Sequence, residues 1–238
     1  MSFRIIPRLE VKSRNLIKGK KMEGLKKVGS PIDFIKKYYE DGADEILICD
    51  IVASLYNRDF NFDFLKEVSE NIFLPLNVGG GLRDLENVSK AFVNGADKVV
   101  LNSCLFDSLD ILKKIASIYG SQSLVAETQI IRNNEKYELR YESGRNKADI
   151  EYFEWIKILE KNMVGEILIV SIDNDGIESS NIDFSFLKKV RDTVDISLVY
   201  GGGINNKSQI DMLKNIGFQG ASISRLLHLN EKKISELL

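Results

Sequence analysis

The sequence predicts a single (β/α)₈ barrel made of two similar halves, and three observations lead to this prediction. Short apolar runs alternate with amphipathic segments along the chain, which is typical of a parallel sheet covered by helices. The length of 238 residues is close to the roughly 250 residues of an ordinary eightfold barrel. A glycine motif at Val78–Leu82 recurs at Tyr200–Ile204, about half a chain later. We therefore expect one domain over residues 1–238, with half-barrels at about 1–120 and 121–238.

The first half contains four strand candidates, each a short run rich in apolar residues and followed by a helical pattern. Ser30 before Pro31 predicts a capped helix start, because proline suits the first helical position. The strands are expected at Arg4–Val11, Glu45–Asp50, Leu74–Val78 and Lys98–Asn102, and the helices at Ile32–Glu40, Phe62–Glu70, Leu85–Val93 and Leu109–Tyr119.

The second half repeats this order. Its strands are expected at Leu124–Ile130, Glu166–Ser171, Ile196–Tyr200 and Ala221–Ser224, and its helices at Ile150–Leu159, Phe184–Val190 and Ser208–Leu213, followed by a short terminal helix. Two longer connections, Lys12–Gly29 and Arg132–Asp149, are expected to be irregular. Both follow the first strand of a half and should emerge at the C-terminal rim, where active sites of this fold lie.

Composition excludes several classes of function. The formal net charge of -2 argues against general nucleic-acid binding, which needs a basic surface. No apolar run is long enough to span a membrane and the start of the chain lacks a signal pattern, so we expect a cytoplasmic protein. Cys49 and Cys104 are expected to be small buried hydrophobes. His228 is the only histidine and is expected to be a packing or loop residue, so no histidine-based triad or metal cluster can form.

The repeated glycine turns predict two anion-binding corners. A strand that ends in three glycines leaves no side chain between its backbone N–H groups and an anion, and the next helix directs its positive end there. The alternative is a tight turn without a ligand. Because the turns follow strands 3 and 7, they should face each other and hold an elongated ligand with two phosphates. The phosphate-binding candidates are Gly79, Gly80, Gly81, Asn102, Ser103, Gly176, Gly201, Gly202, Gly203, Ser224 and Arg225.

The catalytic residues are expected to lie between these two anion-binding corners. Glu10 ends strand 1, Gln129 ends strand 5, and three aspartates end strands 2 and 6. Carboxylates at this rim are candidates for general acid–base catalysis, with helix capping or solvated loop charges as the alternative. Lys18 could clamp a phosphate or close a lid, or be an ordinary surface lysine. The catalytic candidates are Glu10, Lys18, Asp50, Gln129, Asp173 and Asp175, and neither a cofactor nor a metal is implied.

The chain closely resembles the cyclase subunit of imidazole glycerol phosphate synthase, a half-barrel-repeat enzyme of histidine biosynthesis. The likeness covers essentially the whole chain, with a shortened C-terminus. It is carried by Arg4–Ile6, Lys18–Gly19, Gly42–Glu45, Asp50–Ser54, Val78–Gly81, Gly95–Val99, Gly120–Gln122, Gly165–Leu168 and Ser171–Gly176.

The resemblance implies a partner at the N-terminal face of the barrel. In that family a glutaminase subunit docks there, and ammonia passes along the barrel axis to a bisphosphorylated ribulosyl intermediate at the opposite rim. A ring of alternating charges guards the passage, and it falls here on Arg4, Glu45, Lys98 and Glu166, with Asp97 on the docking surface. The alternative role of the ring is a structural layer of salt bridges.

At the catalytic rim the sequence departs from the family. The two catalytic aspartates fall on Glu10 and Gln129, and an amide cannot exchange protons usefully near neutral pH. A phosphate-contacting serine falls on Arg225, beside Ser224, and two threonines fall on Val170 and Ile177.

Three hypotheses follow. The first is a paralogue that keeps the glutaminase and its ammonia, with altered cyclase chemistry, and passes ammonia to a separate sugar amidotransferase for a surface polysaccharide. The second is the cyclase of histidine biosynthesis, with Glu10 and a second rim group, Glu127 or Asp173, taking over proton transfer. The third is a scaffold that activates a glutaminase and binds a phosphorylated effector, without catalysis of its own.

Overall fold

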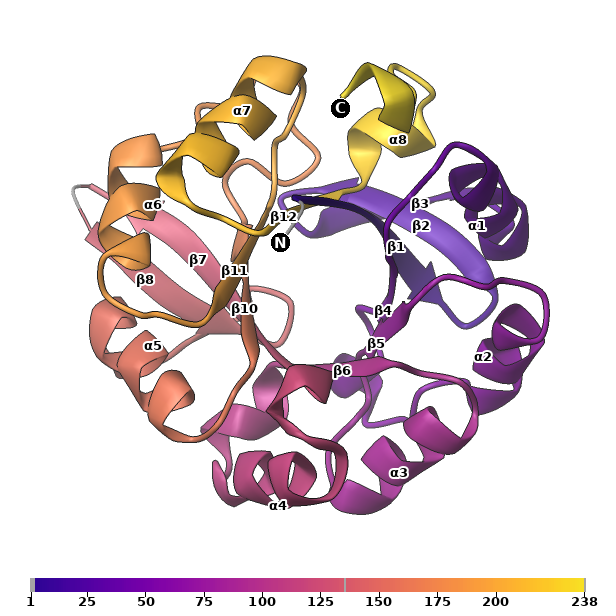
Figure 1. Cartoon of the computed structure of the whole chain (residues 1–238), viewed down its shortest axis with the longest axis horizontal. Helices are drawn as coiled ribbons and strands as arrows, with labels where there is room; N and C mark the ends of the chain where they lie inside the picture. Colours follow the sequence, from indigo (N-terminus) through magenta and orange to yellow (C-terminus); the bar gives the residue numbers. More distant parts are fainter. Residues whose placement is uncertain (1–2, 135, 238) are drawn as a thin grey trace.

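A computed structural model describes residues 3–134 and 136–237 and shows a closed barrel of eight parallel strands (Figure 1). Neighbouring strands pair in the order in which they are named, and β10 also pairs with β7, which closes the cylinder. The barrel strands are β10 (Glu166–Ser171), β11 (Ser197–Gly201), β12 (Gly220–Ile223), β1 (Arg4–Lys12), β4 (Ile46–Asp50), β5 (Leu76–Gly79), β6 (Lys98–Leu101) and β7 (Leu124–Asn133). The predicted fold class is confirmed.

Helices surround the barrel on its outside (Figure 1). They are α1 (Pro31–Glu40), α2 (Phe62–Ser69), α3 (Leu85–Val93), α4 (Asp110–Tyr119), α5 (Tyr152–Lys161), α6 (Phe184–Arg191), α7 (Lys207–Ile216) and the short α8 (Arg225–His228). Short 3₁₀ turns lie at η1 (Ser54–Tyr56), η2 (Ser103–Phe106), η3 (Ser121–Ser123) and η4 (Ile234–Glu236). Within the described residues, no helix has the length and apolar character needed to cross a bilayer.

Helix starts in the two halves use the same chemistry. Asp84 caps α3 by accepting from the backbone N–H of Asn87, and Asn206, 122 positions later, caps α7 in the same way through Gln209. These side chains satisfy N–H groups that have no partner within the helix. Ser30 differs from the prediction, because its side chain makes no capping hydrogen bond. Pro31 alone marks that start, since it has no N–H to satisfy.

Buried apolar residues form two clusters that the barrel wall separates. The larger cluster fills the space between strands and helices. The smaller one lies inside the barrel and contains Ile6, Leu47, Val100, Val125, Leu168, Val170 and Val199. Because side chains alternate across a strand, β1, β4, β6, β7, β10 and β11 each contribute to both clusters.

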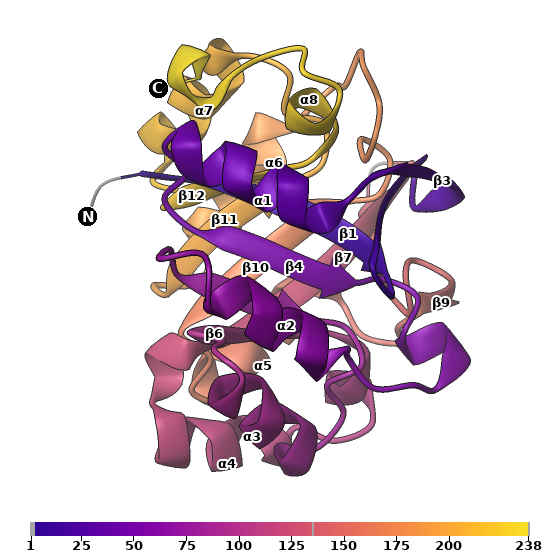
Figure 2. The same cartoon turned by 90° about the vertical axis from the view of Figure 1, so that its right-hand side faces the viewer.

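The two long connections are ordered hairpins, so the prediction that they are irregular is wrong. β1 and β7 continue beyond the barrel and pair with antiparallel strands, which are β2 (Asn15–Lys20) with β3 (Glu23–Gly29), and β8 (Lys136–Tyr141) with β9 (Asn146–Lys147). Pairing satisfies backbone groups that a loop would leave to water. The turns use residues with positive φ, namely Lys21 and Met22 in the first hairpin and Glu142, Ser143 and Gly144 in the second. Figure 2 shows β3 and β9 at one end of the barrel, away from the N-terminus.

Candidate functional site

A closed ring of four charged side chains crosses the N-terminal end of the barrel. Arg4 contacts both Glu45, at 2.7 Å, and Glu166. Lys98 completes the ring, because its Nζ lies 3.1 Å from Glu45 and 3.6 Å from Glu166. The structure therefore brings together all four residues that the sequence assigned to the ammonia gate. Each cation touches both anions, so no charge in the ring is left uncompensated.

Neighbouring polar groups hold this ring in place. Asn77 donates from Nδ2 to Glu45, and Ser197 donates to Glu166, each at 2.8 Å. Burial alone would raise the pKa of Glu45, but the hydrogen bond from Asn77 and the charge of Arg4 lower it. The sequence analysis did not identify Asn77 or Ser197. Asp97 lies outside the ring, exposed, and accepts from the backbone N–H of Leu76 at 2.8 Å, which fixes β6 against β5.

A second layer of charges lies on the other side of the inner apolar cluster. Arg8 is 3% exposed and donates to Glu127 at 2.9 and 3.4 Å. Its Nε lies 3.5 Å from Glu10. Two charge layers thus bracket the apolar interior of the barrel, because residues 4, 6, 8 and 10 alternate with outward-facing residues on β1. That same alternation could have revealed Arg8, which the sequence analysis missed.

Lys18 is a buried member of this layer rather than a loop or surface lysine. It lies on β2, is 8% exposed, and donates to both oxygens of Glu10 at 2.9 Å and to Asp175 at 2.6 Å. Burial alone would lower the pKa of the Lys18 ammonium, but the two carboxylates outweigh it and raise the pKa. Burial and the charge of Glu10 raise the pKa of Asp175. Glu10, the first residue predicted to be catalytic, is therefore a carboxylate held between two cations.

Gln129, the second residue predicted to be catalytic, holds a hairpin in place. Gln129 donates to Glu127 at 2.8 Å and accepts from the backbone N–H of Gly144 at 2.8 Å. Gly144 lies at the tip between β8 and β9. The amide thus satisfies a donor and an acceptor at once. Glu10 and Gln129 are connected only through Arg8 and Glu127 among the described contacts.

The other aspartates predicted for catalysis have local partners. Asp50 is 2% exposed and contacts the guanidinium of Arg58 at 2.7 Å. Burial raises the pKa of Asp50 despite that cation. Asp173 accepts from the backbone N–H of Arg132 at 2.6 Å. Neither contact caps a helix, and the burial of Asp50 differs from the solvated loop charge that was the predicted alternative.

The two glycine turns lie on opposite sides of the barrel mouth. β5 and β11 are separated by three strands in either direction around the cylinder. Gly80 and Gly81, and equally Gly202 and Gly203, have φ between 75° and 101°. A Cβ on Gly80 would lie 2.1 Å from the carbonyl oxygen of Asp50, so that position requires glycine.

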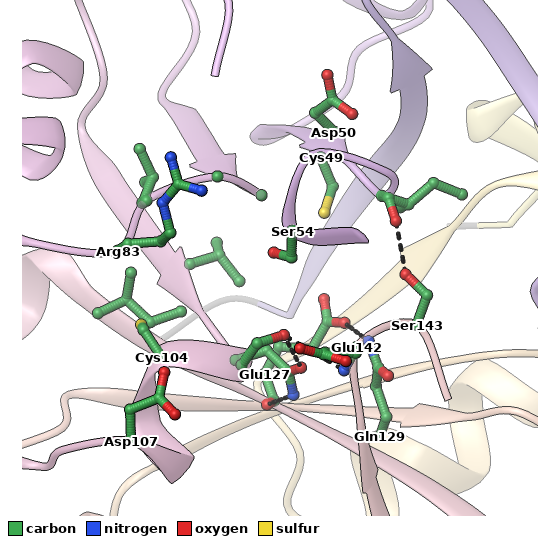
Figure 3. A pocket seen from close by; sticks show the side chains of 18 of the residues that line it. Cys49, Asp50, Ser54, Arg83, Cys104, Asp107, Glu127, Gln129, Glu142 and Ser143 are labelled. Atoms are coloured by element: carbon green, nitrogen blue, oxygen red, sulfur yellow. Dashed lines mark hydrogen bonds between the residues drawn. The ribbon is translucent and has the colours of Figure 1, made fainter. Parts of the chain in front are cut away.

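Each turn borders a cavity, and the two cavities differ in size. The first-half cavity has a volume of about 200 Å³ and is lined by Gly80, Gly81, Asn102 and Ser103. Figure 3 shows Glu127, Gln129 and Glu142 on one side of it, with Cys49, Asp50 and Arg83 on the other. The second-half cavity measures only about 10 Å³, and the residues that line it include Gly176, Gly202, Gly203, Ser222, Ser224 and Arg225.

His228 lies in α8 and is a packing residue. The sequence analysis expected either a packing or a loop residue at this position. It is 2% exposed, hydrogen-bonds Tyr38 at 2.6 Å and lies 3.0 Å from the carbonyl oxygen of Arg8. Burial and the charge of Lys18 lower its pKa to about 3. Cys49 is buried and Cys104 partly buried, and burial raises the pKa of both thiols.

The closed barrel, its two glycine turns and its inner charge layers define a (β/α)₈ barrel of two half-barrel repeats. Comparison with known proteins agrees with this. The family described as histidine biosynthesis protein matches residues 4–233.

Curated relatives named imidazole glycerol phosphate synthase subunit HisF cover nearly the whole chain. Identity is 32% with the protein of Thermococcus onnurineus, over 100% of this chain and 94% of that one. It is 34% with that of an Exiguobacterium species, over 98% and 91%, and 35% with that of Legionella pneumophila, over 88% and 99%. The chain belongs to the HisF family.

Proposed function

We propose that this chain is the barrel subunit of a glutamine amidotransferase complex, and that it receives ammonia from a glutaminase subunit through its axis. It serves a cytoplasmic pathway that amidates a surface-polysaccharide sugar, and its cyclase chemistry is altered. One contrast carries the proposal. The charged ring at the N-terminal end is complete. At the other end, Glu10 is paired with Lys18 and Arg8, and Gln129 is hydrogen-bonded to Gly144.

Proton transfer needs a group that can reach a substrate and change its protonation. Glu10 is 3% exposed and contacts two cations, and Gln129 does not titrate. A bound intermediate would have to displace a buried ion network before either side chain could act. The loss of a buried partner costs about 3–5 kcal/mol, and this cost opposes cyclisation.

Docking of a glutaminase is supported by the face around the ring. Phe73 is 81% exposed and Val93 is 86% exposed, and exposed apolar side chains are informative when several lie on one face. Phe73 precedes β5 and Val93 ends α3, so both lie at the N-terminal face. Met163, between α5 and β10, is also exposed there. An apolar rim around a charged opening fits a protein partner.

The second candidate function is the cyclase of histidine biosynthesis, which the 32–35% identity to HisF subunits favours. One assay separates the two. Purified chain is given ammonium salts and the ribulosyl intermediate, and release of imidazole glycerol phosphate is measured. We expect no product above background. Turnover near that of a HisF subunit would reject the first proposal.

The remaining alternative, a scaffold that only activates a glutaminase, is tested at the ring. Arg4→Ala and Glu45→Ala are combined with a glutaminase and a sugar amidotransferase, with labelled glutamine as the nitrogen source. We expect transfer of label to the sugar to fall while glutamine hydrolysis stays stimulated. If both variants leave transfer unchanged, ammonia does not pass the ring and the scaffold is favoured.

A further inference from the structure

The two glycine corners share a backbone but differ in the side chains around it. At the offset of 122 positions that relates the glycine turns, Val100 corresponds to Ser222 and Ser103 corresponds to Arg225. The second half therefore adds a hydroxyl and a guanidinium where the first half has an alkyl group and a hydroxyl. These changes make the second corner the better anion site.

Ser222 gives independent evidence for a ligand at the second corner. It is 3% exposed, and within the described residues its Oγ has no hydrogen-bond partner. A buried hydroxyl without a partner is unfavourable by about 1–3 kcal/mol. Ser222 lines the second-half cavity together with the backbone of Gly202 and Gly203. A bound anion would accept from this hydroxyl.

Charge also favours the second corner. None of the described residues that line its cavity is acidic, and Arg225 is among them. Arg225 now contacts Glu231 and donates to Asn205 at 2.9 Å. The cavity of about 10 Å³ holds roughly one water molecule. An anion would enter as Arg225 exchanges Glu231, which is partly exposed, for the ligand.

The first-half corner, in contrast, is lined by several acidic side chains. Four carboxylates line its cavity, those of Asp50, Asp107, Glu127 and Glu142. Arg83 is the one cation among the described lining residues, and it is paired with Asp59 at 2.5 Å. A phosphate carries up to two negative charges near neutral pH. It would be repelled by carboxylates within a few ångströms, even though Arg58 and Arg8 offset two of them.

A chain of ion pairs runs from one corner to the other. It begins at Glu127 in the first cavity, passes through Arg8, Glu10 and Lys18, and ends at Asp175, the neighbour of Gly176 in the second cavity. The two cavities share no lining residue. Buried, ion-paired side chains thus connect the two cavities, which do not form one continuous groove.

We propose that this barrel mouth binds ligands with one phosphate, held at the second-half corner alone, and that the first-half corner no longer binds an anion. The inference rests on the proposed function in one respect, since both assume that the mouth no longer serves the family's bisphosphate. It differs from the earlier expectation of two phosphate sites.

The test measures binding by the full chain in a calorimeter. The probes are inorganic phosphate, glucose 6-phosphate and glucose 1,6-bisphosphate, of which the last two differ only by the second phosphate. We expect one phosphate site per chain, and an affinity for the bisphosphate within about threefold of that for the monophosphate. Ser222→Ala, which is nearly isosteric, and Arg225→Ala should each weaken phosphate binding about tenfold. Ser103→Ala, at the first corner, should change it less than twofold.

Three results would overturn the proposal. They are two phosphates per chain, a bisphosphate bound more than tenfold tighter than the monophosphate, or a loss in Ser103→Ala equal to that in Ser222→Ala. Absence of phosphate binding at millimolar concentration would overturn it as well. Ammonia transfer is measured separately, with the ring variants. A failure here therefore leaves ammonia delivery standing, and the reverse also holds.

Discussion

His228 links the stability of the fold to pH through a single buried imidazole. Burial lowers its pKa from 6.5 to about 3 in the folded chain. Between these values the unfolded chain binds a proton that the folded chain excludes. The free energy of unfolding should therefore fall as the pH drops below about 6.5, by up to about 1.4 kcal/mol for each unit.

Urea denaturation at a series of pH values between 7 and 4 measures this slope. His228→Gln can still hydrogen-bond Tyr38 and does not titrate. It should be less stable at neutral pH but should show a shallower pH dependence. An unchanged slope would assign acid sensitivity to other groups, of which Glu45 is a candidate, because its pKa is lowered in the folded chain and its protonation therefore favours unfolding.

Glu10 and Gln129 belong to a buried network with Arg8, Lys18 and Glu127. Substituting these two residues alone should therefore not restore cyclisation. Glu10→Asp combined with Gln129→Asp supplies the family's residue types. Arg8 and Lys18 remain, however, and a shift near 1 Å can cost about 100-fold in rate. We expect the folded double variant to stay at least about 100-fold below a HisF subunit in release of imidazole glycerol phosphate. Full recovery would show that the buried cations do not restrain the site.

At the scale of elements, Lys18 holds the β2–β3 hairpin over the barrel mouth. The backbone N–H groups of Lys21 and Met22 also donate to Asp175, at 2.8 Å to its carbonyl and 3.3 Å to its carboxylate. Met22 packs against the inner apolar cluster. The hairpin is therefore docked on the barrel through Asp175.

Lys18→Met should release this hairpin, because it leaves Glu10 and Asp175 buried without their shared cation. Breaking such a pair costs about 3–5 kcal/mol. Trypsin cleavage after Lys20, Lys21, Lys26 or Lys27 should then be faster than in the unmodified chain. Lys147→Met is the matched control on the other hairpin, since it removes an exposed ion pair worth about 0–1 kcal/mol. Equal cleavage of the two variants would show that Lys18 does not hold the β2–β3 hairpin on the barrel.

The elements of the barrel could be predicted because each depends on a local pattern. The expected strand Glu166–Ser171 and helix Leu85–Val93 are found with those bounds. The two hairpins could not be predicted as readily, because most of β3 is exposed and the hairpins pair with extensions of β1 and β7. Pairing between segments decided their structure, and local composition did not.

At the scale of the molecule, the repeat predicted two facing glycine turns but not their different surroundings. The four ring residues could be identified from resemblance, and the structure brings them together. The acidity of the first cavity arises when β7 and its hairpin bring Glu127 and Glu142 beside β5 and β6. Burial of Lys18 likewise needs Glu10 and Asp175, which are 165 positions apart. Such contacts depend on closure of the barrel.

Assembly with a glutaminase should depend on the apolar face around the ring. Phe73→Asp combined with Val93→Asp places two charges on that face without burying them, since both side chains are more than 80% exposed. We expect the variant to melt within a few degrees of the unmodified chain but to bind a HisH-type glutaminase at least about 100-fold more weakly, because charges at the centre of an interface lose apolar burial and their own hydration. Size-exclusion chromatography and calorimetry of the mixture measure this.

Tyr56→Asp is the matched control for that experiment. Tyr56 is 63% exposed and lies in η1, after β4, so it belongs to the opposite end of the barrel. Its substitution should leave glutaminase binding unchanged. If Tyr56→Asp weakened the complex and the Phe73 and Val93 variant did not, the glutaminase would dock over the barrel mouth. Ammonia would then arrive beside the acidic cavity without crossing the ring, and the ring would be a structural layer of salt bridges only.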